Sequence, residues 1–256
     1  METINEAIAE MDTIVQSCRD KSSRIGYFAV LYRMVTIRVR DGILAGEFED
    51  NPRMEKLDII FAKRFIDAYH AYQTEQQITE SWKLAFDAAV STKHLVLQHL
   101  LLGMNAHINL DLGIAAVETM KGKNLENIEG DFNKINQVLG DLVDDVKLNI
   151  GTISPTFSRL IRLSKGKEEI LVNFSIKLAR EGAWKFAKRL AEAKDQSDTI
   201  GKRDKVISLL AKGLIRPGLK LRLLIWIAGL SEWKSVPEIM DQLGKIAEAQ
   251  ITKAQA

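Results

Sequence analysis

The sequence predicts an all-α fold, a single multi-helix, bundle-like domain spanning residues 1–256 around a long central helix. Apolar residues recur mostly three and four positions apart rather than alternating, and this spacing is the period of a helix. The four prolines stand where helices can begin or end. With 46% apolar and 27% charged residues, the composition is that of a globular protein that buries a substantial core.

In the N-terminal half the apolar period predicts helices over residues 4–17, 25–43, 54–72, 80–89 and 92–120. Asn51 is expected to cap the third of these, with Pro52 at its first helical position. The last is the central helix, and it contains Gly103 and Gly113. Each glycine costs about 1 kcal/mol relative to alanine in a helix, so we expect close packing or a break at these points.

In the C-terminal half helices are predicted over residues 128–148, 168–194, 202–214, 219–230 and 236–251. The break at residues 151–155 is the one place where the chain could be subdivided. It is too short to require two domains, and we therefore predict one.

The overall charge gives no reason to expect a nucleic-acid partner, because the formal net charge is only +2. The lone Cys18 excludes an internal disulfide, and the acidic first residues do not resemble a secretory signal. The longest apolar run, residues 223–230, is far shorter than the roughly 20 residues of a transmembrane helix. These observations predict a cytoplasmic protein without a transmembrane segment.

Residues 212–222 are basic and amphipathic. This pattern is compatible with contact to an anionic membrane surface, although a solvated helix with one buried face is favoured.

Polar residues interrupt the leucine-rich central helix at regular intervals. His99, Gly103, His107 and Asp111 are four apart and therefore share one face, while Asn105 and Asn109 lie on the far side. A helix with polar groups on two faces and leucines between them is expected to be surrounded by other helices. Buried imidazole and carboxylate groups are costly unless each has a partner. We therefore regard His99, His107 and Asp111 as the candidate catalytic residues.

The pair of His107 and Asp111 has two mechanistic interpretations. The two side chains can share one divalent metal ion, or Asp111 can orient His107 for general base catalysis. His99 would then serve as a second acid or base. It is eight residues from His107, hence roughly 12 Å along a straight helix, which is too far for the two to ligate one ion easily.

Residues elsewhere could complete such a site. Asp67 and His70 are three apart on the third helix and would supply further metal ligands; the alternative is that they face solvent near a helix end. Arg180 shares a helix face with Trp184 and could bind a ligand carboxylate or neutralise Asp111, although an interhelical salt bridge is favoured. Asn105 and Asn109 are candidate ligand-binding residues, with structural hydrogen bonding as the favoured alternative.

Several segments resemble an uncharacterised bacterial domain family of unknown function. The most specific is Leu102-Gly-Met-Asn-Ala-His-Ile-Asn-Leu-Asp-Leu112, accompanied by Trp82-Lys-Leu-Ala-Phe-Asp87 and by Arg180 with Trp184 as an Arg-x-x-x-Trp element. The resemblance covers most of the chain. It implies a common helical domain centred on residues 99–111, and it implies no particular reaction.

Three functions remain open on the sequence alone. The first is an enzyme with a buried His/Asp site, with or without one divalent metal ion, acting on a small, partly apolar substrate. The second is a non-catalytic module that binds an apolar small molecule through the leucine-rich interior. The third is a closed hydrogen-bond network that only fixes helix register.

Overall fold

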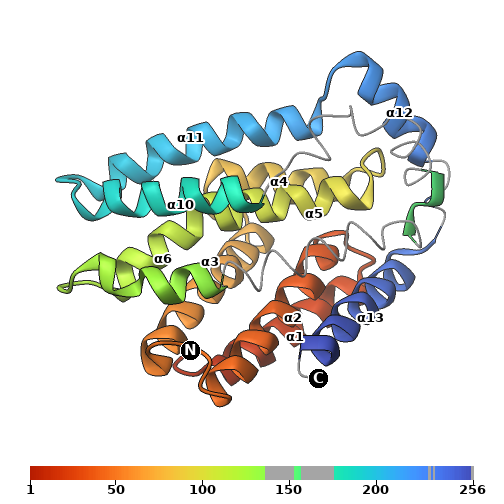
Figure 1. The fold of residues 1–256 in the computed structure, drawn as a ribbon. Coiled ribbons are helices and arrows are strands. Elements are labelled where there is room, and N and C mark those ends of the chain that lie inside the picture. The colour runs from red at the N-terminus through yellow and green to blue at the C-terminus, as the bar shows by residue number, and fades with distance from the viewer. Residues whose placement is uncertain (136–152, 157–175, 230–231, 233, 255–256) are drawn as a thin grey trace.

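The computed structural model describes residues 1–135, 153–156, 176–229, 232 and 234–254 of the chain. Every regular element among these residues is a helix (Figure 1). The predicted all-α fold is therefore confirmed. The predicted helix over 128–148 and the first part of that over 168–194 fall largely outside the described residues.

Four helices precede the central one: α1 (Ile4–Asp20), α2 (Ile25–Leu44), α3 (Asn51–Gln73) and α4 (Glu80–Val90). Thr3 caps α1 by accepting a hydrogen bond from the backbone N–H of Glu6. At α3 the expected cap is wrong by one residue. Asp50, not Asn51, accepts the backbone N–H of Arg53 at 3.0 Å, and Asn51 is already helical.

The central helix consists of α5 (Val96–Ala106), a π-helical turn η1 (His107–Asp111) and α6 (Leu112–Thr119). Every residue from 95 to 116 is buried. Helices α2, α4 and α11 pack on α5, while α3, α10 and α11 contact the π turn. The expectation that other helices surround the central helix is confirmed.

Within the described part of the chain, one helix, Val96–Thr119, is long and apolar enough to cross a membrane by length and composition. Of its most apolar window, 94% is buried inside the protein. Its leucines therefore pack against the neighbouring helices.

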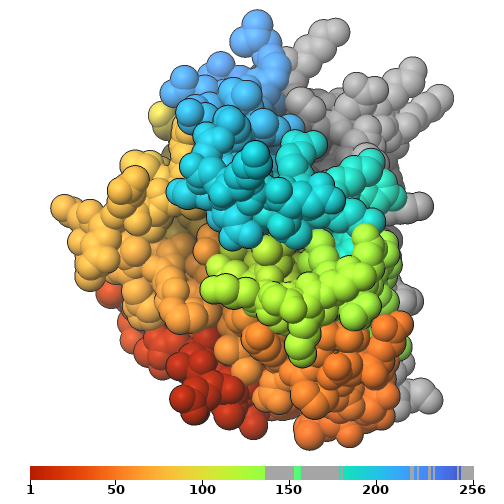
Figure 2. All heavy atoms as spheres, turned by 90° about the vertical axis from the view of Figure 1, so that its left-hand side faces the viewer, coloured from red at the N-terminus to blue at the C-terminus, as the bar shows by residue number. Residues whose placement is uncertain are grey.

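The C-terminal elements are a 3-10 turn η2 (Leu125–Ile128) and helices α10 (Ile176–Ala191), α11 (Gln196–Ile215), α12 (Leu219–Gly229) and α13 (Val236–Ala254). Helix α10 packs on α6, α11 on α4 and α5, and α13 on α2. Figure 2 shows part of this order on one face, where the segment around α6 lies between α3 and the pair α10–α11. The helices thus enclose the π turn from both halves of the chain.

Candidate functional site

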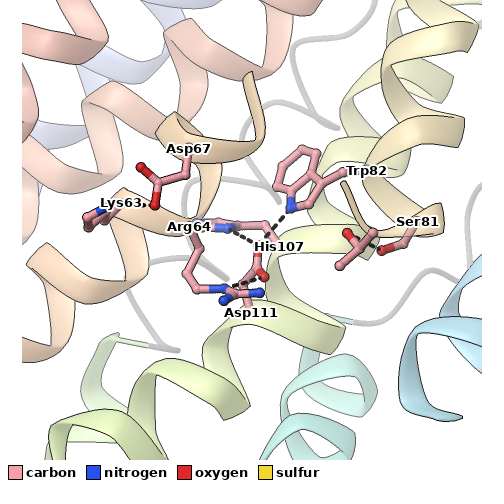
Figure 3. Close-up of polar contacts among 8 residues, drawn as sticks. Lys63, Arg64, Asp67, Ser81, Trp82, His107 and Asp111 are labelled. Carbon is pink, nitrogen blue, oxygen red and sulfur yellow. Dashed lines mark hydrogen bonds and ion pairs between the residues drawn. The ribbon is translucent and has the colours of Figure 1, made fainter. Parts of the chain in front are cut away.

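The π-helical turn carries the two residues that the sequence singled out most strongly. His107 begins it and Asp111 ends it, and their side chains are 1% and 0% exposed. In a π turn the backbone hydrogen bonds join residues five apart, and such turns occur frequently at functional sites. Figure 3 shows both side chains turned toward α3 and α4, where Arg64 and Trp82 meet them.

Three N–H donors surround the Asp111 carboxylate. Arg64 Nε donates to Oδ1 at 2.9 Å. Trp82 Nε1 donates to Oδ2 at 2.8 Å, and His107 Nδ1 lies 3.3 Å from the same oxygen. Burial alone would raise the pKa of Asp111, but the hydrogen bond from His107 and the charge of Arg64 lower it below its ordinary value. Asp111 is therefore an ionised carboxylate at neutral pH.

The His107 ring lies inside an aromatic cage. It stacks on Phe61 with ring centroids 3.6 Å apart and planes within 6°. Tyr32 contacts its edge at 4.2 Å between centroids. The rest of the cage is formed by Phe28, Phe65 and Trp82.

The protonation state of His107 follows from these surroundings. Burial lowers its pKa, and the contacts with Asp111 offset this only in part, so the imidazole is neutral at pH 7. Because a carboxylate can only accept hydrogen bonds, the ring proton of His107 is on Nδ1. The other nitrogen, Nε2, is buried and has no hydrogen-bond partner within the described residues. Chemically, the pair is an oriented imidazole with a free lone pair, the arrangement of a general base.

Arg64 is the only member of this network with substantial exposure. Its side chain is 29% exposed, whereas that of Asp111 is fully buried. Its Nε donates a hydrogen bond to Asp111. Its Nη atoms have no hydrogen-bond acceptor among the residues described. Arg64 therefore connects the buried carboxylate to the protein surface.

Gly103 is a point of close packing, one of the two outcomes expected for it. A Cβ atom built on Gly103 would lie 2.5 Å from Cγ of Phe28, so this glycine allows α2 and α5 to approach closely. What remains is a cavity of about 10 Å³, the size of a single water molecule. Its polar lining comes from Arg24 and His99. Neither this cavity nor the pockets beside residues 92–96 and beside residues 72–78 are lined by His107 or Asp111.

His99 is not part of the His107 centre. Its ring contacts His94 and Tyr27 at centroid distances of 5.9 and 5.8 Å. Both ring nitrogens are buried without a partner among the described residues. Burial, followed by the charges of His94 and Arg24, lowers its pKa to about 3. His99 is thus a neutral imidazole in the core, and the expectation that it joins His107 in catalysis has no geometric support.

The four-ligand metal set of His107, Asp111, His70 and Asp67 does not assemble. Among the described residues no group of three or more His, Cys, Asp or Glu side chains could hold a metal ion. His70 bonds Glu10 of α1 at 2.8 Å, and both are exposed. Asp67 is 60% exposed and bonds Lys63 (Figure 3). The physical reason is that the side chains of Asp67 and His70 are directed to solvent, whereas the long side chain of Arg64, one turn before Asp67, reaches Asp111.

Asn105 and Asn109 fasten the central helix to α11. Asn105 Nδ2 donates to the carbonyl of Ile207 at 3.0 Å, and Asn109 Nδ2 donates to Oδ1 of Asn105 at 3.0 Å. The backbone carbonyl of Asn109 accepts a hydrogen bond from Arg203. These contacts correspond to structural hydrogen bonding, the alternative to ligand binding that the sequence analysis favoured for Asn105 and Asn109. The side chain of Arg180 lies outside the described residues.

Sequence reasoning missed the two residues that hold Asp111, namely Arg64 and Trp82. The only available signal was indirect: a carboxylate within a leucine run requires a cation and N–H donors. It also missed Asp58, whose two carboxylate oxygens are buried without a partner within the described part of the protein. The hydroxyl of Tyr32 is likewise unpartnered.

One protein family matches the part of the chain that contains this site. A family of unknown function, DUF5995, matches residues 4–217, which include Arg64, Trp82, His107 and Asp111. No curated protein and no solved structure matches the chain. The match covers well over half of the 256 residues and bears out the resemblance to a family of unknown function. The chain therefore belongs to the DUF5995 family.

Proposed function

We propose that this protein is an acid–base enzyme in which His107 is the catalytic base and Asp111 its orienting partner. The observation that carries the proposal is the free Nε2 of His107, buried without a partner among the described residues, while Nδ1 is held by a carboxylate. A buried polar atom without a hydrogen bond is costly. A role in catalysis explains this cost, because a general base needs a free lone pair to accept a proton from the substrate.

The chemistry requires one proton acceptor and one stable counter-charge. His107 Nε2 takes a proton from water or from an acidic group of the substrate, while Nδ1 keeps its own proton toward Asp111. The imidazolium so formed is stabilised by the ionised Asp111, which Arg64 and Trp82 fix in place. The proton on Nε2 then passes to the leaving group of the substrate, and this transfer restores the neutral imidazole of His107.

The surroundings favour a small, partly apolar substrate. The cage of Phe28, Tyr32, Phe61, Phe65 and Trp82 presents aromatic surface to His107. Because His107 is only 1% exposed, a substrate enters only when a cage side chain moves aside. The guanidinium of Arg64 marks the side on which the network reaches solvent, and we place the polar end of the substrate there. A metal ion is not part of the proposal, because Asp67 and His70 make other contacts.

A purely structural network is the second candidate, and the packing supports it. Both oxygens of Asp111 accept hydrogen bonds, and Phe28 fills the space beside Gly103. In this case replacing the whole polar set by apolar residues of similar volume would be neutral or stabilising. The two candidates differ in whether small molecules reach Nε2 in the folded protein.

Diethyl pyrocarbonate, a small electrophile that acylates neutral imidazoles, tests this access. We expect modification of His107 in the folded protein, identified by peptide mass, with the exposed His70 as the internal positive control. Because the pKa of His107 is lowered, its reaction should persist below pH 6.5, where an ordinary imidazole is protonated. Modification of His107 only after unfolding would contradict the proposal and favour the structural network.

The second test is the rate of hydrolysis of p-nitrophenyl butyrate, a small and partly apolar ester. Removing a general base costs on the order of 100-fold or more in rate, so wild type should exceed His107→Gln by at least that factor. His70→Gln is the matched control and should retain the wild-type rate. Equal rates for wild type and His107→Gln would exclude ester hydrolysis and, together with an unmodified His107, would contradict the enzyme proposal.

A further inference from the structure

Exposed apolar side chains are concentrated on α11 and α12. Among the described residues nine large apolar side chains are exposed, and six of them fall between residues 206 and 226. These six are Val206, Leu209, Leu210, Leu219, Leu223 and Trp226. The two helices lie along the edge of the molecule opposite α1 and α2 (Figure 1). Single exposed leucines need no explanation, but a concentration of this kind marks an interaction site.

Helix α12 presents its apolar side outward. Leu219, Leu223 and Trp226 follow one another at spacings of four and three residues, so they share one helix face. Their exposed fractions are 82%, 58% and 64%. Arg222 is exposed beside them, whereas Ile225 on the other side is buried.

The same segment is strongly basic. From residue 205 to residue 231 the sequence contains no aspartate or glutamate. It contains five cationic residues, Lys205, Lys212, Arg216, Lys220 and Arg222. The formal charge of the whole chain is only +2, so this segment departs sharply from the rest. An exposed apolar face with cations around it is complementary to an anionic, partly apolar surface.

We propose that α12, with the end of α11 that precedes it, binds peripherally to an anionic lipid bilayer. Leu219, Leu223 and Trp226 would enter the interface between lipid headgroups and acyl chains, where tryptophan is favoured. Arg216 and Arg222 would contact lipid phosphates and other anionic headgroups. Helix α12 has 11 residues, too few to span the bilayer, so the contact is with one leaflet.

Charge argues for lipid over a second copy of this chain as the occupant. Lys212 is paired with Glu80 of α4. In a symmetric dimer each copy would contribute the same patch, and the exposed Arg216 and Arg222 of the two copies would repel one another. The family match ends at residue 217, so α12 lies beyond it. None of the exposed apolar residues takes part in the contacts of His107 or Asp111, so the two proposals fail separately.

Cosedimentation with vesicles tests the proposal on the full-length protein. The probes are vesicles of phosphatidylcholine alone and vesicles with about one-third phosphatidylserine, which carry a negative surface potential. We expect binding to the anionic vesicles that weakens with added salt. Leu219→Ser/Leu223→Ser should weaken it at least about tenfold, because two apolar side chains no longer enter the interface. Leu44→Ser/Val90→Ser is the matched control, since both residues are more exposed than Leu223 but lie outside this segment.

The charge contribution is tested separately. Arg216→Gln/Arg222→Gln should reduce binding to anionic vesicles about tenfold or more and leave the weak binding to neutral vesicles unchanged. Trp226 fluorescence should shift to shorter wavelength on binding, and Trp226→Phe should abolish the shift. Equal affinity for neutral and anionic vesicles, or absence of binding to both, would overturn the proposal. Light scattering that shows a dimer disrupted by Leu219→Ser/Leu223→Ser would also overturn it and would assign the face to a second copy.

Discussion

The charge of Asp111 determines the character of the buried centre. Taking an ion into the core costs several kcal/mol unless its partners replace water, and here Arg64, Trp82 and His107 do so. His107 remains neutral because burial lowers its pKa, and the positive charge of Arg64 acts in the same direction. The sequence indicated that Asp111 needed such partners. It could not identify Arg64, which lies 47 residues earlier in the chain, because only the packing of α3 on the π turn brings the two together.

Asp58 presents the opposite case, a buried carboxyl group without partners among the described residues. Burial, with a contribution from Glu55, raises its pKa from 3.8 to about 8. Between these values the folded protein keeps a proton that the unfolded chain releases. The free energy of unfolding should therefore fall as pH rises through this window, by up to about 1.4 kcal/mol per pH unit.

Replacing Asp58 by asparagine removes this titration. We expect Asp58→Asn to gain stability over wild type progressively between pH 5 and pH 8, measured by urea unfolding at several pH values. Asp67→Asn alters an exposed carboxylate on the same helix and should leave the pH slope unchanged. A difference between Asp58→Asn and wild type that is constant with pH would show that Asp58 does not titrate in this range.

Individual helices were predictable because their signals are local. The predicted start and end of the helix over 80–89 agree with α4 to within one residue, since its apolar period and its flanking residues are adjacent in sequence. The π turn at His107–Asp111 had no such signal. It depends on contacts of the central helix with α3, α10 and α11, which local sequence does not encode. At Gly103 the sequence left close packing and a break as alternatives, and only the assembled fold shows that Phe28 of α2 packs against it.

Glycines of the helices can be ranked by what surrounds them. At Gly103 an added Cβ would lie 2.5 Å from Cγ of Phe28, and this ring is held in the core. We therefore expect Gly103→Ala to destabilise the protein by about 1–3 kcal/mol. At Gly201 on α11 nothing lies within 4 Å of the added atom, so Gly201→Ala should stabilise by about 0.5–1 kcal/mol through helix propensity. Chemical denaturation of the two variants measures both signs, and stabilisation by Gly103→Ala would show that α2 and α5 can separate without cost.

The assembly of the helices shows which long-range relations decide the fold. Helix α13 returns to pack on α2, and α11 packs on α4 and α5. Asp204 of α11 accepts hydrogen bonds from the backbone N–H groups of Glu80 and Ser81, and so caps α4. The ion pair between Arg19 and Asp241 joins α1 to α13. None of these pairings has a signature in one sequence, although the need for the central helix to be surrounded was evident from its composition.

These contacts support our proposal that the chain is one domain rather than two divided near residues 151–155. If so, heating should give a single transition whose calorimetric enthalpy equals the van 't Hoff enthalpy. Met240 of α13 is 1% exposed and lies against Gly26 of α2, so Met240→Ala should cost about 2–5 kcal/mol. That loss should lower the whole transition, because α13 and α2 unfold together, whereas Lys245→Ala on the same helix should leave it in place. Two transitions, of which Met240→Ala moves only one, would instead show that the C-terminal helices unfold as a separate unit.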